Sequence, residues 1–276
     1  MAEFLTLVQT DASLLPCQMR RVSPAAPLAG PASQPSGVGF FQSADVLLRK
    51  RPGSQKMDAA SLTKDVASEC LVVTAGPAAG GPFAEEGTLP FRFRRWLWAQ
   101  AGAFEAIAPA QPKLVENVPE YLRRQISGSS PAEAVFFNFL SGLRASGGMD
   151  DLDLDPLTAA RSMAEAVKAL DKAMGDAAAG KPAPLTLCAT NGRIVVAVRR
   201  GAGLHYALLE GLIPCELHNI GLDAAETKAN VRAHRLLKAV ALASTVEPGH
   251  GVAWMEVPDA HLVTVSRTLE VHVAPL

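Results

Sequence analysis

The residue types that could bind metal or act as nucleophiles are thinly spread along this chain. The four cysteines are Cys17, Cys70, Cys188 and Cys215. They form no Cys-x-x-Cys pair, and the six histidines form no His-x-x-x-His or His-Glu-x-x-His motif. This spacing predicts scattered, reduced thiols of a cytoplasmic protein rather than a disulfide framework or a zinc site. We expect no metal and no cofactor.

Two other segments superficially resemble ligand-binding loops. Residues 74–81 are rich in Gly and follow an expected strand, but they lack the Lys-Ser/Thr pair of a phosphate loop, and Pro77 has no N–H to donate. Residues 149–155 are acidic, but they lack the central Gly and the distal Glu of a calcium loop. We interpret the first as a structural loop and the second as a solvated loop in which Asp155 caps the following helix.

The composition argues against several classes of partner. The net charge is −1 over 276 residues, so no global field attracts the protein to nucleic acid or to an anionic membrane. No stretch of about 18 apolar residues occurs, so we expect no membrane-spanning helix. Glu3 stands where a signal peptide needs positive charge, and a cytoplasmic location is therefore expected.

Short apolar or alternating runs predict strands on both sides of a helical middle. The expected strands cover residues 4–8, 39–42, 46–51, 70–74, 96–99, 185–189, 193–199, 237–244, 261–265 and 269–273. Alternation places Trp96 and Trp98 on one face of their strand. Residues 43–45 connect one hairpin. Asn191-Gly192 predicts a second hairpin turn in which both turn residues have positive φ.

Two helices are predicted in the middle of the chain. Ser130 and Glu133 have the spacing of a reciprocal capping box, with Pro131 at the first helical position. A second helix is expected to begin near Pro156 and to end at Gly180, with apolar residues at helical spacing. This order of elements is not a βαβ alternation, so it favours layered sheets with helices outside.

Six stretches occur in an order that is more specific than any one of them. They are residues 37–52 (GVGFF…VLLRKRP), 81–91 (GPFAEEGTLPF), 95–102 (RWLWAQAG), 130–136 (SPAEAVF), 185–195 (LTLCATNGRIV) and 240–258 (VALAS…WMEVP). They resemble GxGWY…LYKRP, GPVSxxNTHPF, RWLFAHNG, TDSEALF, LNLALTDGRRLV and VVASEPL…WxxVP of the class II glutamine amidotransferases. The resemblance implies an α+β fold, the four-layered αββα sandwich of Ntn hydrolases, as one domain over residues 1–276.

The same resemblance implies that the family's catalytic groups are missing. Enzymes of this family attack glutamine with an N-terminal cysteine, and the matching residue here is Ala2, whose methyl group cannot be a nucleophile. Gln100, Ala101 and Gly102 match the His-Asn-Gly of RWLFAHNG. In the family the Asn side chain and the Gly N–H hold the oxyanion, so Ala101 removes one donor.

Two substrate-binding positions are altered as well. The family binds the glutamine α-carboxylate with an Arg near the position of Gly76, and it binds the α-amine with an Asp that matches Pro131. Neither Gly nor Pro offers a charge for these contacts. The resemblance therefore implies a glutamine cleft without its clamps.

One alternative keeps an enzymatic activity. Some Ntn hydrolases cut off a propeptide to expose their nucleophile, and Cys17 is the candidate for such a relocated nucleophile in an amide hydrolase or glutaminase. Cleavage there would remove the expected first strand, so we interpret Cys17 as a buried thiol. We predict a non-catalytic amidotransferase-like protein that acts as a binding, regulatory or accessory subunit. Its expected ligands are a protein partner or a second copy of itself, and a small molecule in the vestigial glutamine cleft.

Overall fold

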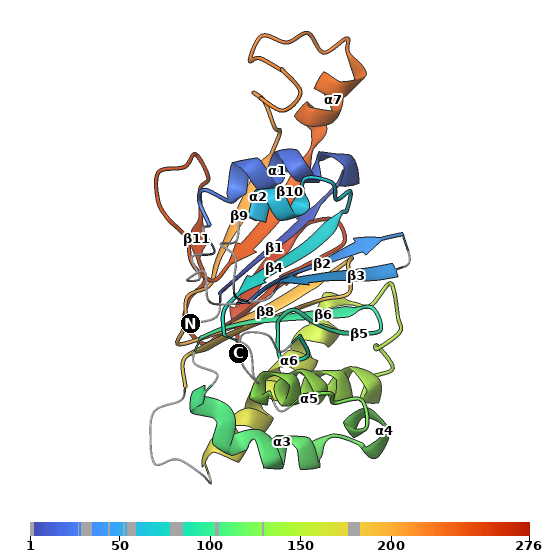
Figure 1. The fold of residues 1–276 in the computed structure, drawn as a ribbon, viewed down its shortest axis with the longest axis vertical. Coiled ribbons are helices and arrows are strands. Elements are labelled where there is room, and N and C mark those ends of the chain that lie inside the picture. Colours follow the sequence, from blue (N-terminus) through green and yellow to red (C-terminus); the bar gives the residue numbers. More distant parts are fainter. Residues whose placement is uncertain are drawn as a thin grey trace.

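Two antiparallel sheets pack face to face and carry helices on both outer faces (Figure 1). The computed structural model describes residues 3–26, 28, 35–43, 45–51, 53, 59–77, 85–102, 105–128, 130–175 and 183–276. This architecture confirms the predicted α+β fold with its αββα order of layers. Among the described residues, no helix is both long and apolar enough to cross a membrane.

The seven-stranded sheet has the order β11-β9-β10-β1-β4-β2-β3. Its strands are β1 (Glu3–Gln9), β2 (Ser36–Gln42), β3 (Asp45–Arg51), β4 (Cys70–Ala75), β9 (His205–Glu210), β10 (Lys238–Ala243) and β11 (Met255–Glu256). The predicted first strand is central, because β1 pairs with β4 on one side and with β10 on the other. Its residues after Glu3 are all buried, as expected for a strand that is covered on both faces.

The six-stranded sheet has the order β13-β12-β8-β7-β6-β5. Its strands are β5 (Phe91–Phe93), β6 (Trp96–Gly102), β7 (Leu185–Thr190), β8 (Val195–Arg200), β12 (His261–Val265) and β13 (Val271–Pro275). Alternation along β6 divides its side chains between two cores, which confirms the prediction for the two tryptophans. Trp96 and Trp98 face the helices, where Trp98 stacks on Phe136 with ring centroids 5.4 Å apart, while Leu97 faces the other sheet.

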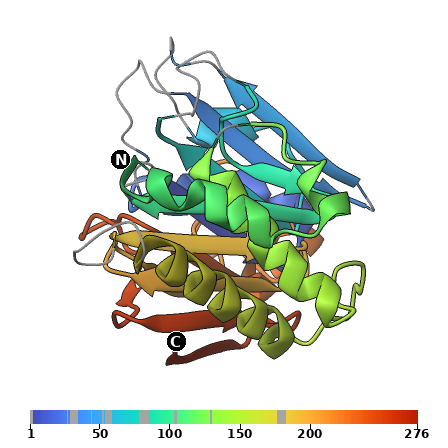
Figure 2. The same ribbon diagram turned by 90° about the horizontal axis from the view of Figure 1, so that it is seen from below.

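Helices cover the outer face of each sheet. The described helical segments are the 3₁₀ segments η1 (Ala12–Leu14) and η2 (Glu105–Ala110) and the helices α1 (Leu15–Val22), α2 (Ala59–Thr63), α3 (Gln111–Asn117), α4 (Glu120–Arg123), α5 (Pro131–Ala145), α6 (Pro156–Gly175) and α7 (Ala229–Leu236), of which α7 lies beyond α1 and covers neither sheet. The helices α1 and α2 pack on the seven-stranded sheet. Figure 2 shows α5 and α6 lying across the six-stranded sheet. The predicted end of α6 at Gly180 lies outside the described residues.

The turn predicted at Asn191-Gly192 is wrong in its type. Strands β7 and β8 do form the expected hairpin, but Thr190 pairs with Val195, so the loop has four residues and β8 begins two residues later than expected. Only Gly192 has positive φ, at 91°. The Asn191 side chain instead accepts hydrogen bonds from the backbone N–H groups of Arg193 and Ile194, both at 3.0 Å.

The reciprocal capping box predicted at α5 is also wrong. Helix α5 does begin at Pro131, but the Ser130 side chain makes no capping hydrogen bond. The Glu133 carboxylate points back to the preceding loop, where it accepts hydrogen bonds from the N–H groups of Ser127, at 3.0 Å, and Gly128, at 2.8 Å. The Glu133 carboxylate therefore holds the loop that precedes the helix and does not cap the helix N-terminus. The Asp155 cap of α6 is confirmed, because its carboxylate accepts from the Leu157 N–H at 3.0 Å.

A long connection joins β9 to β10, two neighbouring strands of the seven-stranded sheet. Residues 211–237, here called the β9–β10 excursion, leave β9 and return to β10 through α7, and they project beyond α1 at the top of Figure 1. A small apolar cluster joins the excursion to α1 and contains Leu14, Cys17, Leu212, Cys215, Ile220, Val231 and Leu237. This cluster is separate from the core on which α1 and α2 lie.

Candidate functional site

Several positions matched to the family lie at one end of the space between the sheets. This end is formed by the start of β1, the end of β4 and the end of β6. Thr6 contacts Cys188 at 3.5 Å and Cys70 contacts Thr190 at 3.4 Å, and these two contacts align the sheets. Because Cys70 pairs with Val8, the Phe4 end of β1 lies on the side away from Thr190. We call this side the β6 end, because β6 finishes there with Ala101 and Gly102, opposite the first residues of β7.

Ala101 is buried in the core between the sheets, and its methyl group offers no hydrogen-bond donor. Its neighbour in the register on β7 is Thr186, whose buried hydroxyl makes no hydrogen bond with the described protein. Gln100 points to the opposite face of β6, toward the helices, because side chains alternate along a strand. Its amide therefore does not replace the donor that is missing at Ala101.

Gly102 occupies a position where only glycine fits. Its φ is 109°, and a Cβ added there would lie 2.1 Å from the carbonyl oxygen of Pro184. The backbone of β6 therefore comes so close to the start of β7 that no side chain fits at Gly102. The close backbone packing explains a glycine at this position, whether or not the protein is an enzyme.

The positions matched to the family's substrate clamps lie on two different elements. Gly76 follows β4, whose last residue Ala75 pairs with Glu3 at the start of β1, and its N–H donates to the carbonyl of Pro35 at 3.2 Å. Pro131 is the first residue of α5. Ala2 lies outside the described residues. The sheet topology therefore brings Gly76 to the start of β1, and no side chain at Gly76 or Pro131 can form an ion pair.

A cavity of about 510 Å³ lies beside the first turn of α5. Its lining includes Lys50, Glu85, Arg92 and Glu133, and it includes none of the family positions Gly76, Gln100, Ala101, Gly102 and Pro131. The Lys50 ammonium donates to the carbonyl of Glu85 at 2.8 Å, and burial lowers the pKa of Lys50. The cavity thus presents both signs of charge within one small volume.

Cys17 does not belong to the β6 end. It lies on α1, which packs against the outer face of the seven-stranded sheet, so this sheet separates its thiol from the space between the sheets. Burial and the neighbouring Cys215 thiol raise the pKa of Cys17 to about 12. At neutral pH the thiol is protonated, which is the weakly nucleophilic form.

The expectation that the thiols and histidines are scattered is wrong for four of them. Cys17, Cys215, His218 and His234 come together, with their ligand atoms all within 4.8 Å of one another. We call this group the Cys–His cluster. The sequence holds one local signal for it, the Cys-x-x-His spacing of Cys215 and His218, which is neither a Cys pair nor a His pair. Cys17 is 201 residues away from His218, so no spacing rule connects them.

Comparison with known proteins defines the fold of the chain. No protein-family model and no curated protein sequence matches it. A glutamine aminotransferase class-II domain protein from Silicibacter pomeroyi has a TM-score of 0.58 at 14% identity, over 99% of this chain and 98% of that chain. A predicted glutamine amidotransferase from Pseudomonas aeruginosa PA01 has the same TM-score, 0.58, and the same identity, 14%, over 98% of each chain.

A larger enzyme shows the same arrangement in part of its length. Glutamine phosphoribosylpyrophosphate amidotransferase from B. subtilis has a TM-score of 0.50 at 10% identity, and the match covers 99% of this chain but 49% of the enzyme. The protein thus has the fold of class II glutamine amidotransferase domains, as the resemblance implied. Identities this low define the fold and leave the activity to the residues of the site.

Proposed function

We propose that this protein is a non-catalytic relative of the glutamine amidotransferases, one cytoplasmic domain over residues 1–276 that acts as a binding, regulatory or accessory subunit. The observation that carries the proposal is the buried methyl group of Ala101 at the β6 end. In the matched enzymes this position supplies a side-chain donor to the oxyanion, and the loss of such a donor costs about 10²–10³ in rate. The methyl group of Ala2 removes the nucleophile as well.

The position of Cys17 supports the same proposal. A relocated nucleophile would have to reach the oxyanion position between the sheets, and α1 lies on the other side of the seven-stranded sheet. The Cys17 thiol is also protonated at neutral pH because its pKa is raised to about 12. Both features argue against an amide hydrolase that uses this residue.

Labelling with an electrophilic glutamine analogue tests the proposal directly. The full-length protein and its Cys17→Ser variant are each incubated with the analogue, beside an active class II amidotransferase as a positive control, and intact masses are recorded. We expect an adduct on the control enzyme and none on either form of this protein. A single adduct that maps to Cys17 and disappears in Cys17→Ser would establish the relocated nucleophile instead.

The cavity beside α5 is a candidate binding site for a small-molecule ligand. A volume of about 510 Å³ is within the range of small-molecule sites. Because Lys50, Arg92 and Glu133 line it, we propose that it takes a small zwitterionic molecule. A thermal-shift screen of amino acids and related zwitterions tests this part, with Lys50→Met as the matched variant. A shift that is the same in both proteins would contradict it.

A further inference from the structure

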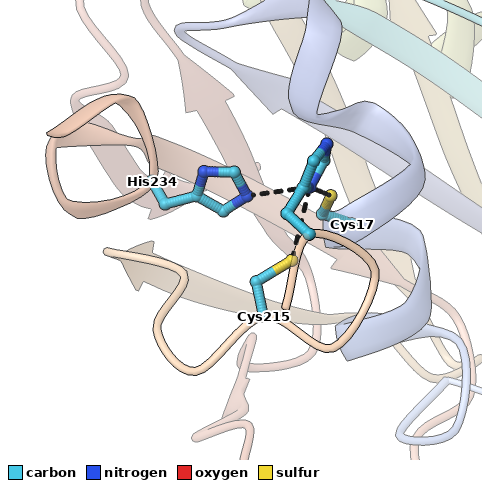
Figure 3. Close-up of side chains that lie close together, drawn as sticks. Cys17, Cys215 and His234 are labelled. Carbon is cyan, nitrogen blue, oxygen red and sulfur yellow. Dashed lines mark hydrogen bonds between the residues drawn. The ribbon is translucent and has the colours of Figure 1, made fainter. Parts of the chain in front are cut away.

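Three separate segments converge on the Cys–His cluster. Cys17 comes from the first turns of α1, Cys215 and His218 from the loop after β9, and His234 from α7. Figure 3 shows Cys17, Cys215 and His234 directed toward one another across the gap between α1 and the β9–β10 excursion. His218 lies between them, because its Nδ1 atom is within 3.6 Å of all three partners.

Three distances within the cluster are close to those of a tetrahedral ligand set. The Nδ1 atom of His218 lies 3.2 Å from the Cys17 Sγ, 3.6 Å from the Cys215 Sγ and 3.2 Å from the His234 Nε2. Zinc bonds of about 2.3 Å to sulfur and about 2.0–2.1 Å to nitrogen place tetrahedral ligand atoms about 3.3–3.8 Å from one another. The three distances lie at or just below this range, and all four ligand atoms lie within 4.8 Å of one another, so small side-chain shifts would let them surround one ion.

Hydrogen bonds among the four side chains do not account for this geometry. The His218 Nδ1 can carry one proton at most, yet three polar atoms crowd around it. The His234 Nδ1 lies 2.7 Å from the carbonyl oxygen of Asn230, which can only accept, so Nδ1 is the protonated nitrogen. With the proton on Nδ1, the Nε2 atom of His234 can offer its lone pair to the cluster, where the His218 Nδ1 lies 3.2 Å away. A ring nitrogen held in this way by a backbone carbonyl is the usual arrangement behind a metal-bound histidine.

The ligand types select the metal. Two thiolates and two imidazoles form a soft, closed, four-coordinate set, which is the composition of structural zinc sites. The two thiolate charges balance the charge of Zn²⁺, so a buried complex has no net charge. His218 is exposed while the other three ligands are buried, which gives the ion a route from solvent. We propose that Cys17, Cys215, His218 and His234 bind a structural zinc ion.

The proposed zinc ion has a mechanical role in this fold. The β9–β10 excursion is joined to α1 by a small apolar cluster and by the Arg21 guanidinium, which donates to the Gly211 carbonyl at 2.7 Å. Three leucines of the excursion, Leu217, Leu222 and Leu236, are exposed. A metal bridge from α1 to both arms of the excursion lowers the entropy of the open state by closing a long loop. The cluster lies outside the space between the sheets, so the proposal does not depend on whether the protein hydrolyses glutamine.

Metal analysis of the full-length protein tests the proposal. The protein is loaded with Zn²⁺, dialysed and measured by inductively coupled plasma mass spectrometry, and a second sample is loaded with Co²⁺ for absorption spectroscopy. We expect about one zinc per chain and, for cobalt, the strong visible bands of a tetrahedral site together with thiolate charge-transfer bands. Competition with a chromophoric chelator then gives the affinity.

Two histidine variants provide a matched pair, since His218 and His272 are both exposed and substitution of either leaves the core intact. We expect His218→Gln to weaken zinc binding by more than about 100-fold, which exceeds the usual effect of removing an outer-shell partner. His272→Gln should bind as the wild type does. Cys215→Ser serves as a second ligand variant and should lose the charge-transfer bands.

Three results would overturn the proposal. The first is less than about 0.1 zinc per chain after loading, which is far from the full occupancy of a structural site. The second is equal zinc affinity in His218→Gln and His272→Gln. The third is a Cys17–Cys215 disulfide in the freshly isolated protein, detected by mass spectrometry after alkylation without reductant, because a disulfide removes both thiolate ligands.

Discussion

The β6 end and the Cys–His cluster lie on opposite faces of the seven-stranded sheet, and they differ in what their residues can do. At the β6 end, Ala101 and Gly102, which we match to an amidotransferase motif, offer a buried methyl group and a glycine backbone but no polar side chain. In the Cys–His cluster, four ligand side chains converge in a region that the family stretches do not include. A shared fold therefore does not by itself determine which side chains occupy a given position.

The largest expected effect concerns the missing nucleophile. The loss of a nucleophile in a comparable catalytic triad costs on the order of 10⁶ in turnover. We expect Ala2→Cys alone to remain inactive with glutamine, because the oxyanion donor and the substrate clamps are still absent. Ala2→Cys combined with Ala101→Asn should exceed the single variant by about 10²–10³ if the β6 end keeps its geometry. Glutamate release measured with a coupled dehydrogenase checks both. Turnover near about 10 per second, the enzyme median, in Ala2→Cys alone would contradict this reading of the β6 end.

Removal of metal should separate the four cysteines into two classes. With zinc bound, we expect all four to react slowly with iodoacetamide, because all four thiols are buried. EDTA should speed alkylation of Cys17 and Cys215 by about tenfold or more, which corresponds to about 1.4 kcal/mol of opening free energy. Cys70 and Cys188, which lie in the core between the sheets, are the internal controls and should not change. Peptide mass spectrometry resolves the four sites, and equal acceleration at all four would point to global unfolding instead of a local bridge.

A smaller effect is expected at the start of α5. The Glu133 carboxylate accepts two backbone N–H groups, and hydrogen bonds to a charged group contribute about 1.5–3 kcal/mol. We expect Glu133→Gln to lower the free energy of unfolding by about this amount, since an amide has one acceptor oxygen and turns its NH₂ toward an N–H. Ser130→Ala should cost less than about 0.5 kcal/mol, because this side chain makes no capping bond. Denaturant titration of the two variants decides the matter. A larger loss of unfolding free energy in Ser130→Ala than in Glu133→Gln would instead support the capping box.

The smallest expected effect is a pH dependence at β9. Burial lowers the pKa of His205 below its usual value of 6.5, although Glu256 acts in the opposite direction. The unfolded chain then binds the proton more readily, so stability is lost as the pH falls below about 6.5 toward the folded pKa. Because the ring is half-buried, the change is small. We expect His205→Gln to reduce the difference in Tm between pH 7 and pH 5, with His272→Gln as the control. An identical difference in both variants would exclude His205 as the source.

The sequence predicted the sheets because local patterns determine them. The run of residues 4–8 is apolar throughout and became the buried central strand β1, and the alternation at residues 96–99 correctly divided the Trp and Leu side chains between two cores. Asn191-Gly192 predicted the hairpin but not its turn, because the Asn side chain bonds to the loop backbone and stabilises a longer connection. Glu133 has the spacing of a capping box, yet the preceding loop offered it two better donors.

The Cys–His cluster shows what the sequence did not predict. Only Cys215 and His218 are close in the chain, while Cys17 and His234 reach them through the packing of α1 and α7 against the same loop. Spacing rules detect ligands within one supersecondary unit, and here the ligand set is completed by tertiary structure. The positions matched to the amidotransferases are assigned by residue type alone, and their role stays a prediction; Ala2 lies outside the described residues.

Glutamate release by the wild-type protein is the measurement that tests the central proposal most directly. The full-length, zinc-loaded protein is incubated with saturating glutamine, and glutamate is quantified by a coupled dehydrogenase beside an active class II amidotransferase. We predict turnover below about 0.1 per second, well under the enzyme median of about 10 per second. Sustained turnover above that level, abolished by the electrophilic glutamine analogue, would contradict the proposal and identify the protein as an active amidohydrolase.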